Sequence, residues 1–577
     1  MAREAAFPSL AAARERVGAR WILAAGGLAA AGLFGILVVY PSLVLVANAF
    51  LADGRPTLDH VLRTLRDPAA ARTLWNSLLV SSSSAALGSA LGAILAWLVT
   101  RTDLPAARFW DTVALLPYMI PPFIGAIAWV YLLGPVGYLN QAWMALTASP
   151  DPLLVIYGPG GIIFVLTLYG YPIAYATVRA LLARMDPALE EAARIAGARP
   201  FDLLREITLP LVRPGLLAGA LLLFMSSLAN FGIPAVLGFP ARYFVLPTKI
   251  YATILNFDAP FNLQTAAALS LWLVAVAAVA LQAQRLLVRR MRFAVVAGRS
   301  AGGGAPRIAL GRWRWLATAA LGVFAFVAIV LPLGAILLTA ITRAYGLPPT
   351  PDNVTLRHFA TAFLGIPKAQ RAFLNSLALS AGAATAIAVL ALGLGYLIGR
   401  VRIRGAAVLD LLITIPYAVP GTVVALAMIL AWLRPVPGLG LRLYNTIWII
   451  LLAYVARFLV FGVRTVLAGL SQVHESLEEA ARISGARGWQ AFRDIVLPII
   501  RPSVAAGWFL VFIPAMVELT LSILLFSVGK ETIGVVVFGL HEEGKIALSA
   551  AVAFVVTVLL VALHLLTRVA AVRELVR

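Results

Sequence analysis

The sequence contains no cysteine and carries little charge for its length. Zero cysteines in 577 residues exclude disulfide bonds, thiolate metal sites, iron–sulfur clusters and a cysteine nucleophile. Only 12% of the residues are charged and 62% are hydrophobic, whereas an average soluble domain has about 25% charged and about 45–50% apolar residues. These are too few polar side chains to cover a water-soluble globule. The recurring apolar stretches of about 20 residues therefore predict a polytopic membrane protein.

Lysine is also scarce. Only four of the 46 basic residues are lysines, at positions 249, 368, 530 and 545. None of them precedes a serine or threonine, so the sequence lacks the GxxxxGK[ST] loop that cradles nucleotide phosphates. The five histidines stand too far apart in the sequence to form a metal motif. If ATP drives this protein, another chain must bind the nucleotide.

Twelve apolar segments are present, and each is long enough to cross a hydrocarbon core of about 30 Å as a helix. None of them alternates apolar and polar residues as a barrel strand does. The sequence therefore predicts an all-α polytopic fold with about twelve transmembrane helices. The approximate limits of the segments are 21–49, 74–99, 109–134, 160–182, 215–238, 264–287, 314–342, 374–399, 408–433, 445–468, 503–527 and 547–568.

The basic residues indicate an orientation. A net charge of +21 would suit a nucleic-acid partner, or arginines at the inner ends of membrane helices. With the N-terminus inside, 31 of the 46 basic residues fall at inner segments and 14 at outer ones, and Arg457 lies inside a span. This bias follows the positive-inside rule. We therefore expect lipid around the chain, both termini in the cytoplasm and no nucleic-acid partner.

The two halves of the sequence repeat one another. An offset of 299 residues relates Arg101 to Arg400, and an offset of 288 relates Glu191 to Glu479. A glycine-rich segment lies between the halves. We predict a first half over residues 1–297, a flexible cytoplasmic linker over 298–313 and a second half over 314–577. Because each half has six spans, the halves should be related by a pseudo-twofold axis along the membrane normal.

The strongest local pattern lies between the fourth and fifth spans of each half. It reads LEEAARIAGAR over residues 189–199 and LEEAARISGAR over 477–487. The composition favours a helix that ends at Gly197 or Gly485, followed by a second short helix that ends at the next proline, residue 210 or 498. A generic amphipathic interfacial loop is the alternative. Two copies with identical spacing favour a small face that enters a groove on another protein.

Both copies contain Glu-Ala-Ala, three residues, Gly, nine residues, Ile, one residue and Leu-Pro. This pattern resembles the signature loop of type I, binding-protein-dependent ABC importer permeases, and the resemblance covers nearly the whole chain as two fused permease halves. It implies alternating access in a bacterial inner membrane, a periplasmic binding protein, and two ATPase subunits that hold ATP and Mg²⁺. The chain itself would have no catalytic residue and no cofactor. The implied ATPase-coupling residues are Glu190, Glu191, Ala192, Ala193, Gly197, Glu478, Glu479, Ala480, Ala481 and Gly485.

Within that family, residues 230–237 and 518–525 look like those of the fused ferric-iron permeases. The resemblance therefore implies ferric iron as the substrate. Aminoalkylphosphonate, sugar phosphate, thiamine and polyamine stay open as alternatives for the same machinery. An ion-coupled secondary transporter would leave the duplicated loop unexplained, and a membrane enzyme would need clustered polar motifs that the spans lack.

Two repeat-related polar residues lie within the spans. Asn230 and Glu518 each follow the proline that opens their span by 16 residues, or about 24 Å along a helix. We interpret the pair as part of the outer gate or translocation path, where Glu518 would be a transient ligand for Fe³⁺. A helix–helix hydrogen bond is the alternative. Arg457 would pair with Glu518 or extend to an interface. No firm metal site is predicted.

Overall fold

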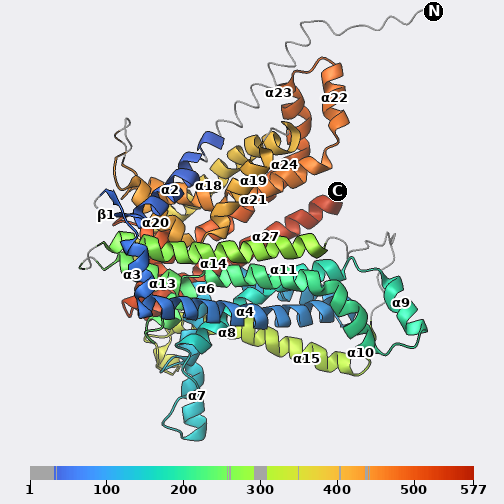
Figure 1. Cartoon of the computed structure of the whole chain (residues 1–577). Coiled ribbons are helices and arrows are strands. Elements are labelled where there is room, and N and C mark those ends of the chain that lie inside the picture. The colour runs from blue at the N-terminus through green and yellow to red at the C-terminus, as the bar shows by residue number, and fades with distance from the viewer. Residues whose placement is uncertain are drawn as a thin grey trace, which may run out of the picture. The chain divides into compact units, whose positions relative to one another are not determined.

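The computed structural model describes residues 31–576 apart from 34, 53, 257, 259–260, 292–307, 349, 402–404, 436–439 and 441. Helices dominate this part of the chain, in which the only named strands are β1 (Leu51–Ala52) and β2 (Arg55–Pro56) (Figure 1). Eleven helices are long and apolar enough to cross a membrane, and a bent pair makes up to twelve. The predicted all-α, multi-pass fold is therefore confirmed. The part of the first predicted span before residue 31 lies outside the described residues.

The chain divides into two compact units, each discontinuous in sequence. Unit 1 consists of residues 1–48 and 371–534, and unit 2 of residues 49–370 and 535–577. The first span thus belongs to the unit built mainly from the second repeat, and the last span to the unit built mainly from the first. The predicted division at 298–313 concerns the duplicated sequence and stays a prediction, since most of that segment lies outside the described residues.

Unit 1 is built from long helices broken by short ones, where η denotes a 3₁₀ or π turn. In chain order they are η1 (Gly35–Val39), α2 (Tyr40–Ala49), α18 (Pro367–Tyr396), η7 (Leu397–Val401), α19 (Ala406–Ala418), α20 (Gly421–Trp432), α21 (Ile447–Gln472), α22 (Glu475–Ile483), α23 (Gly488–Ala491), η8 (Phe492–Val496), α24 (Leu497–Met516) and α25 (Ser522–Leu525).

Unit 2 contains the hairpin and the remaining helices. They are α3 (Asp59–Arg66), α4 (Pro68–Arg101), α5 (Ala107–Val113), η2 (Leu116–Met119), α6 (Pro122–Leu133), α7 (Tyr138–Thr147), α8 (Pro159–Leu182), α9 (Pro187–Ile195), α10 (Pro200–Asp202), η3 (Leu203–Thr208), α11 (Leu209–Leu228), α12 (Gly232–Gly238), α13 (Leu246–Ile254), α14 (Asn262–Met291), α15 (Trp313–Ala325), η4 (Phe326–Val330), α16 (Leu331–Ile341), η5 (Pro351–Asn353), α17 (Arg357–Ala360), η6 (Thr361–Gly365) and α27 (Ile546–Val576). Three helices cross the boundary between the units: α26 (Ile533–Glu542) begins in unit 1 and ends in unit 2, α2 has its last residue in unit 2, and α18 has its first four residues there.

In unit 2, α4 forms a long straight support for the loop described below. Asp67 caps its start by accepting a hydrogen bond from the backbone N–H of Ala69 at 2.8 Å. Along its length α4 packs against α8 and α11. A Cβ added at Gly92 would lie 2.7 Å from the backbone nitrogen of Tyr175 on α8, so the glycine lets the two backbones approach closely. The end of α4 at Arg101 is therefore held firmly relative to α8.

Unit 1 uses the same device. The helix α21 packs against α24, and a Cβ added at Gly462 on α21 would lie 2.5 Å from the side chain of Ile387 on α18. Within each repeat, a glycine thus lets two spanning helices approach closely. Membrane helices depend on such close packing because no hydrophobic effect drives them together in lipid.

Prolines interrupt the third and ninth spans. The pair Ala406–Tyr417 and Gly421–Trp432 is bent by 103° at a break that contains Pro420. In the first repeat, the apolar stretch predicted at 109–134 is broken before Pro122, and the candidate span runs over Pro122–Thr147 instead. The predicted limits were wrong there because proline lacks an N–H group and its ring interrupts a regular helix.

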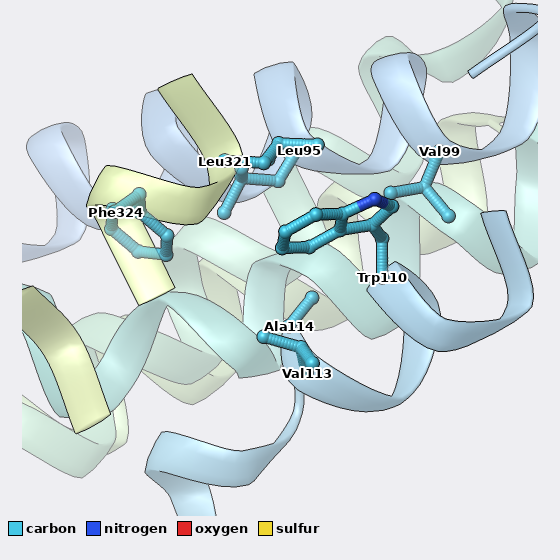
Figure 2. Close-up of a pocket in the computed structure, with 7 residues that line it drawn as sticks. All are labelled: Leu95, Val99, Trp110, Val113, Ala114, Leu321 and Phe324. Atoms are coloured by element: carbon cyan, nitrogen blue, oxygen red, sulfur yellow. The ribbon is translucent and has the colours of Figure 1, made fainter. Parts of the chain in front are cut away.

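Unit 2 also holds a pocket between α4, α5 and α15, shown in Figure 2. Its lining is apolar and carries no charged side chain, so it offers no ligand to a metal ion. The lining residues are Leu95, Val99, Trp110, Val113, Ala114, Leu321 and Phe324.

Candidate functional site

The two repeated segments form the same structure, and we call them the signature loops, over residues 187–208 and 475–496. In the first loop, α9 ends at Ile195, two residues before Gly197, which adopts φ of 88°, and the N–H of Ala198 donates to the carbonyl of Ala193 at 3.0 Å. In the second loop, α22 ends at Ile483, and Gly485, two residues on, adopts φ of 90°. A left-handed residue closed by such a bond is a common helix end, and glycine adopts it without strain. The predicted helix ends at both glycines are confirmed.

The predicted end of the second short helix is wrong. Residues 203–208 form the π turn η3, which runs directly into α11, so Pro210 lies in the first turn of a long helix. In the second loop η8 runs in the same way into α24, past Pro498. Proline is tolerated in the first turn of a helix, and the widened π turn before it lets the chain continue. Each loop is therefore joined to a membrane-spanning helix without a break.

Each loop exposes an apolar face, although its sequence is rich in charge. Ile195 is 89% exposed and its repeat equivalent Ile483 is 86% exposed. We define the apolar face of each loop by three large exposed side chains: Leu189, Ile195 and Phe201 in the first, and Leu477, Ile483 and Trp489 in the second. Isolated exposed apolar residues are ordinary, but the same three positions are exposed in both repeats, which makes this face a candidate docking surface.

The residues predicted to contact the ATPase differ in exposure: most are exposed or half-buried, and two are buried. Glu191, Ala192, Glu479 and Ala480 are exposed, and the glycines are exposed with open space around them. Ala193 and Ala481 are half-buried. Glu190 and Glu478, in contrast, are buried at 1% and 4% exposure, so neither presents its carboxylate to a partner. Their predicted role in coupling is untested, but the structure shows which groups they bind.

Glu190 forms a buried ion pair with Arg101 at the end of α4, and each side chain is 1% exposed. The hydroxyl of Thr208 donates to Glu190 Oε1 at 3.2 Å. One carboxylate on α9 therefore connects the end of α4 with the end of η3, which leads into α11.

Glu478 forms the equivalent pair with Arg400, whose Nε lies 3.1 Å from Glu478 Oε1. The second oxygen accepts hydrogen bonds from the hydroxyl of Tyr396 at 3.0 Å and from Arg482 at 3.1 Å. Arg400 Nη1 also lies 3.5 Å from Glu475 Oε1. The second pair is thus part of a larger network. We call the two ion pairs Arg101–Glu190 and Arg400–Glu478 the loop pairs.

The sequence contains a signal for the loop pairs that the family motif does not include: both charges of each pair are duplicated. Arg101 and Arg400 are repeat-equivalent at an offset of 299, and Glu190 and Glu478 at 288. A duplicated arginine at the inner end of a span and a duplicated glutamate on the next inner loop are complementary charges in both repeats. The signature pattern begins one residue later, at Glu191 or Glu479, and therefore does not include the buried glutamate.

Asn230 and Glu518 serve as helix caps. Asn230 Oδ1 accepts a hydrogen bond from the N–H of Ile233 at 3.0 Å. Both carboxylate oxygens of Glu518 accept from the N–H of Leu521 at 2.9 Å, and Oε2 also accepts from that of Ser522 at 3.1 Å. Each residue lies where a long helix ends and the short α12 or α25 follows. Such breaks free backbone groups that need partners, and these side chains supply them; their predicted gate role is untested.

Arg457 binds the backbone at another helix break, the one between α19 and α20. Its Nη1 donates to the carbonyl of Val419 at 3.4 Å, between α19 and α20. A Cβ added at Gly421 would lie 2.7 Å from that nitrogen, so the glycine makes room for the guanidinium. Within the described residues, no ion pair joins Arg457 to Glu518. The arginine therefore satisfies the backbone of a broken span.

No group of three or more histidine, aspartate and glutamate side chains suited to a metal occurs among the residues that the structure describes. Near the end of α26, His541 packs beside the ring of Tyr131 with centroids 6.1 Å apart. Burial lowers the pKa of His541 to about 4, so its imidazole is neutral near pH 7. Lys545 donates to Glu543 at 2.7 Å, and this hydrogen bond holds the pKa of Glu543 below its usual value.

Two repeats of membrane-spanning helices, each with the same exposed loop, are the architecture of a multi-pass transport permease. The family model described as "Binding-protein-dependent transport system inner membrane component" matches residues 60–293 and 391–573, and the chain belongs to this family. It is the permease component of an ABC importer that works with a binding protein, and it is not itself the ATPase.

Similar proteins match either most of the chain or about one repeat of it. The ferric transport system permease protein FbpB of Actinobacillus pleuropneumoniae is 25% identical over 92% of this chain and 76% of its own length. The Fe(3+)-transport system permease protein FbpB 2 of Haemophilus influenzae is 26% identical over 89% of this chain and 92% of its own. The molybdenum transport system permease protein ModB of Escherichia coli is 28% identical, covering 37% of this chain and 92% of its own length.

Proposed function

We propose that this permease carries ferric iron, delivered by a periplasmic binding protein, across a bacterial inner membrane into the cytoplasm by alternating access. Two relatives that match 92% and 89% of this chain are named as ferric permeases, which supports Fe³⁺ as the substrate. The arginine bias supports an orientation with both termini in the cytoplasm and the signature loops on that side. Asn230 and Glu518 would border the path as helix caps at the breaks.

Two ATPase subunits would dock on the two apolar faces. The observation that carries this proposal is the repetition of three exposed apolar side chains at equivalent positions of two loops that share one helix-ending geometry. Exposed small residues between them, Ala192 and Ala480, leave room for a close approach. ATP and Mg²⁺ would be held by those subunits. Their closure would move both loops, and each loop continues into a spanning helix.

Docking is tested by co-purification from a strain that expresses the permease with its ATPase. Ile195→Asp together with Ile483→Asp should abolish retention of the ATPase, because each change places a carboxylate in a desolvated interface. Both side chains are almost fully exposed in the free chain, so folding should be unaffected. Val528→Asp is the matched control, since Val528 is 93% exposed and lies outside both loops. Full retention by the double variant would contradict the docking proposal.

The substrate is tested separately. The assembled complex in proteoliposomes, with its binding protein outside and ATP inside, should accumulate radioactive Fe³⁺. Accumulation of an aminoalkylphosphonate or a sugar phosphate in place of Fe³⁺ would overturn the iron assignment and leave the docking proposal intact.

A further inference from the structure

The loop pairs are the clearest buried chemistry that the family pattern leaves unused. The two repeats differ in length between the arginine and the glutamate, because the offset changes from 299 to 288 residues between them. The structure nevertheless brings arginine and glutamate together in both repeats. The same contact is thus made across chain segments of different length, which indicates a requirement for the contact itself.

Burial makes the first loop pair a firm connection. Arg101 and Glu190 are each 1% exposed, and removing one partner of such a pair leaves an uncompensated charge in a medium of low dielectric. The pair breaks only at high cost, so α9 and the end of α4 are expected to move together. Thr208 adds the end of η3 to the same carboxylate.

The helix behind the pair does not absorb a displacement. The helix α4 packs closely on α8 through Gly92, and packed backbones of this kind shift as bodies. A push on α9 is therefore passed by Arg101 to α4 and α8, and by Thr208 to α11. In unit 1, Glu478 connects α22 in the same way with η7 and, through Tyr396, with α18.

A short segment near the end of the predicted linker, residues 308–310, is hydrogen-bonded beside the first pair. The N–H of Ile308 donates to the carbonyl of Arg101 at 2.7 Å, and that of Asp103 donates to the carbonyl of Ile308 at 3.1 Å. The side chain of Asp103 accepts from the N–H of Leu310 at 2.8 Å. These three bonds fasten residues 308–310, just before α15, to Arg101, which binds Glu190, and to Asp103. The start of the second repeat in sequence is thereby attached to the first loop pair.

We propose that Arg101–Glu190 and Arg400–Glu478 are positioning pairs that transmit the movement of each signature loop to the spanning helices of its unit. The segment 308–310 makes the first pair the stiffer of the two. The inference rests on the proposed docking of ATPase subunits, since these supply the movement. The alternative is that the pairs only stabilise the fold and transmit no movement.

The absence of cysteine makes a direct test practical. Ala188 on α9 and Ser82 on α4 are both exposed and lie outside the loop pairs. Each is replaced by cysteine and spin-labelled, and the distance distribution is measured in lipid nanodiscs, first on the chain alone. The parent should show a narrow distribution, and Glu190→Gln a broader one. Glu206→Gln is the matched control, because Glu206 is an exposed carboxylate on η3 and should keep the parent width. A Glu190→Gln distribution as narrow as the parent's would overturn the proposal.

The second arm uses the complex with its ATPase. In the parent, ATP and Mg²⁺ should leave the 188-to-82 distance unchanged, because loop and helix move together. In Glu190→Gln the distance should change with nucleotide, and transport per ATP hydrolysed should fall about tenfold while the ATPase is retained. Unchanged transport per ATP in Glu190→Gln would overturn the proposal. If Glu190→Gln fails to fold, Arg101→Lys, which keeps the charge but not the planar fork, decides by the same two measurements.

The two proposals fail in distinguishable ways. If the parent chain never retains an ATPase, the proposed function fails, whereas the distance widths on the chain alone still report on the first loop pair. If the ATPase is retained and both widths and transport per ATP are unchanged by the substitution, only the positioning role fails.

Discussion

The two loop pairs make the same contact in different surroundings. Arg101 and Glu190 are enclosed, at 1% exposure each, whereas Arg400 is 11% exposed and also faces Glu475, which is 56% exposed. Glu190 contacts Arg101 and Thr208, and Glu478 contacts Arg400, Arg482 and Tyr396. The contact between loop and helix is thus common to both repeats, while the exposure of the arginine and the carboxylates beside it differ. Equal substitutions should therefore have unequal effects.

The largest difference is expected when each glutamate is removed. Within the part of the chain that the structure describes, Glu190 is the only ion-pair partner of the buried Arg101, so Glu190→Ala should lower the free energy of unfolding by about 3–5 kcal/mol. Glu478→Ala leaves Arg400 with Glu475 and with the carbonyl of Leu470 at 3.1 Å, so about 1–2 kcal/mol is expected. Thermal unfolding of the purified variants in one detergent measures both. Equal losses would show that the enclosure of the first pair has no energetic consequence.

How far the sequence predicted this site depends on the kind of contact. The helix ends at Gly197 and Gly485 followed from local sequence, because a left-handed helix end needs glycine. The burial of Glu190 did not, since it depends on Arg101, which lies 89 residues earlier in the chain. The roles of Asn230 and Glu518 as caps were also missed: a polar residue within a span is interpreted as functional when the helix break that it serves is not foreseen.

The fold shows the same division. Hydropathy predicted the number of spans, because length and apolar content are local properties. It misplaced the third span, where prolines break the helix, and it gave no sign that residues 1–48 group with 371–534. Packing of helices from distant parts of the chain depends on shape complementarity, such as Gly92 against Tyr175, rather than on hydropathy.

A smaller effect is expected from releasing the segment that is hydrogen-bonded beside the first pair. Asp103→Ala removes the acceptor for the N–H of Leu310 and should cost about 1 kcal/mol. Hydrogen exchange should speed up at residues 308–310 and leave the second loop unchanged. Asp494→Ala, at an exposed carboxylate on η8, is the control and should not alter exchange at 308–310. Unchanged exchange in Asp103→Ala would mean that the segment does not depend on this bond.

Substitution of the glycine at each helix end should have the same effect in both repeats. In this respect the helix ends differ from the loop pairs, whose substitutions should have unequal effects. Gly197→Ala and Gly485→Ala each place a Cβ at a φ near 90°, with no other heavy atom within 4 Å. Each should therefore cost only the strain of the left-handed backbone, about 1 kcal/mol, by thermal unfolding. Larger side chains at these glycines should abolish transport while the fold is kept, because they enlarge the face that meets the ATPase. A clear difference between the two alanine variants would show that one loop end is packed differently from the other.

The smallest effect concerns salt, and it isolates the difference in exposure. Raising NaCl from about 0.1 M to about 1 M shortens the screening length from about 10 Å to about 3 Å. Such screening acts on charges in contact with water and much less on buried ones. The stability lost on Glu478→Gln should therefore shrink by a few tenths of a kcal/mol in high salt, whereas the loss on Glu190→Gln should stay the same. Measuring both variants and the parent at the two salt concentrations cancels the general effect of salt on the protein. Equal salt dependence would place both pairs in the same dielectric, and the stiffness assigned to the first pair would then have to come from the hydrogen bonds to residues 308–310 alone.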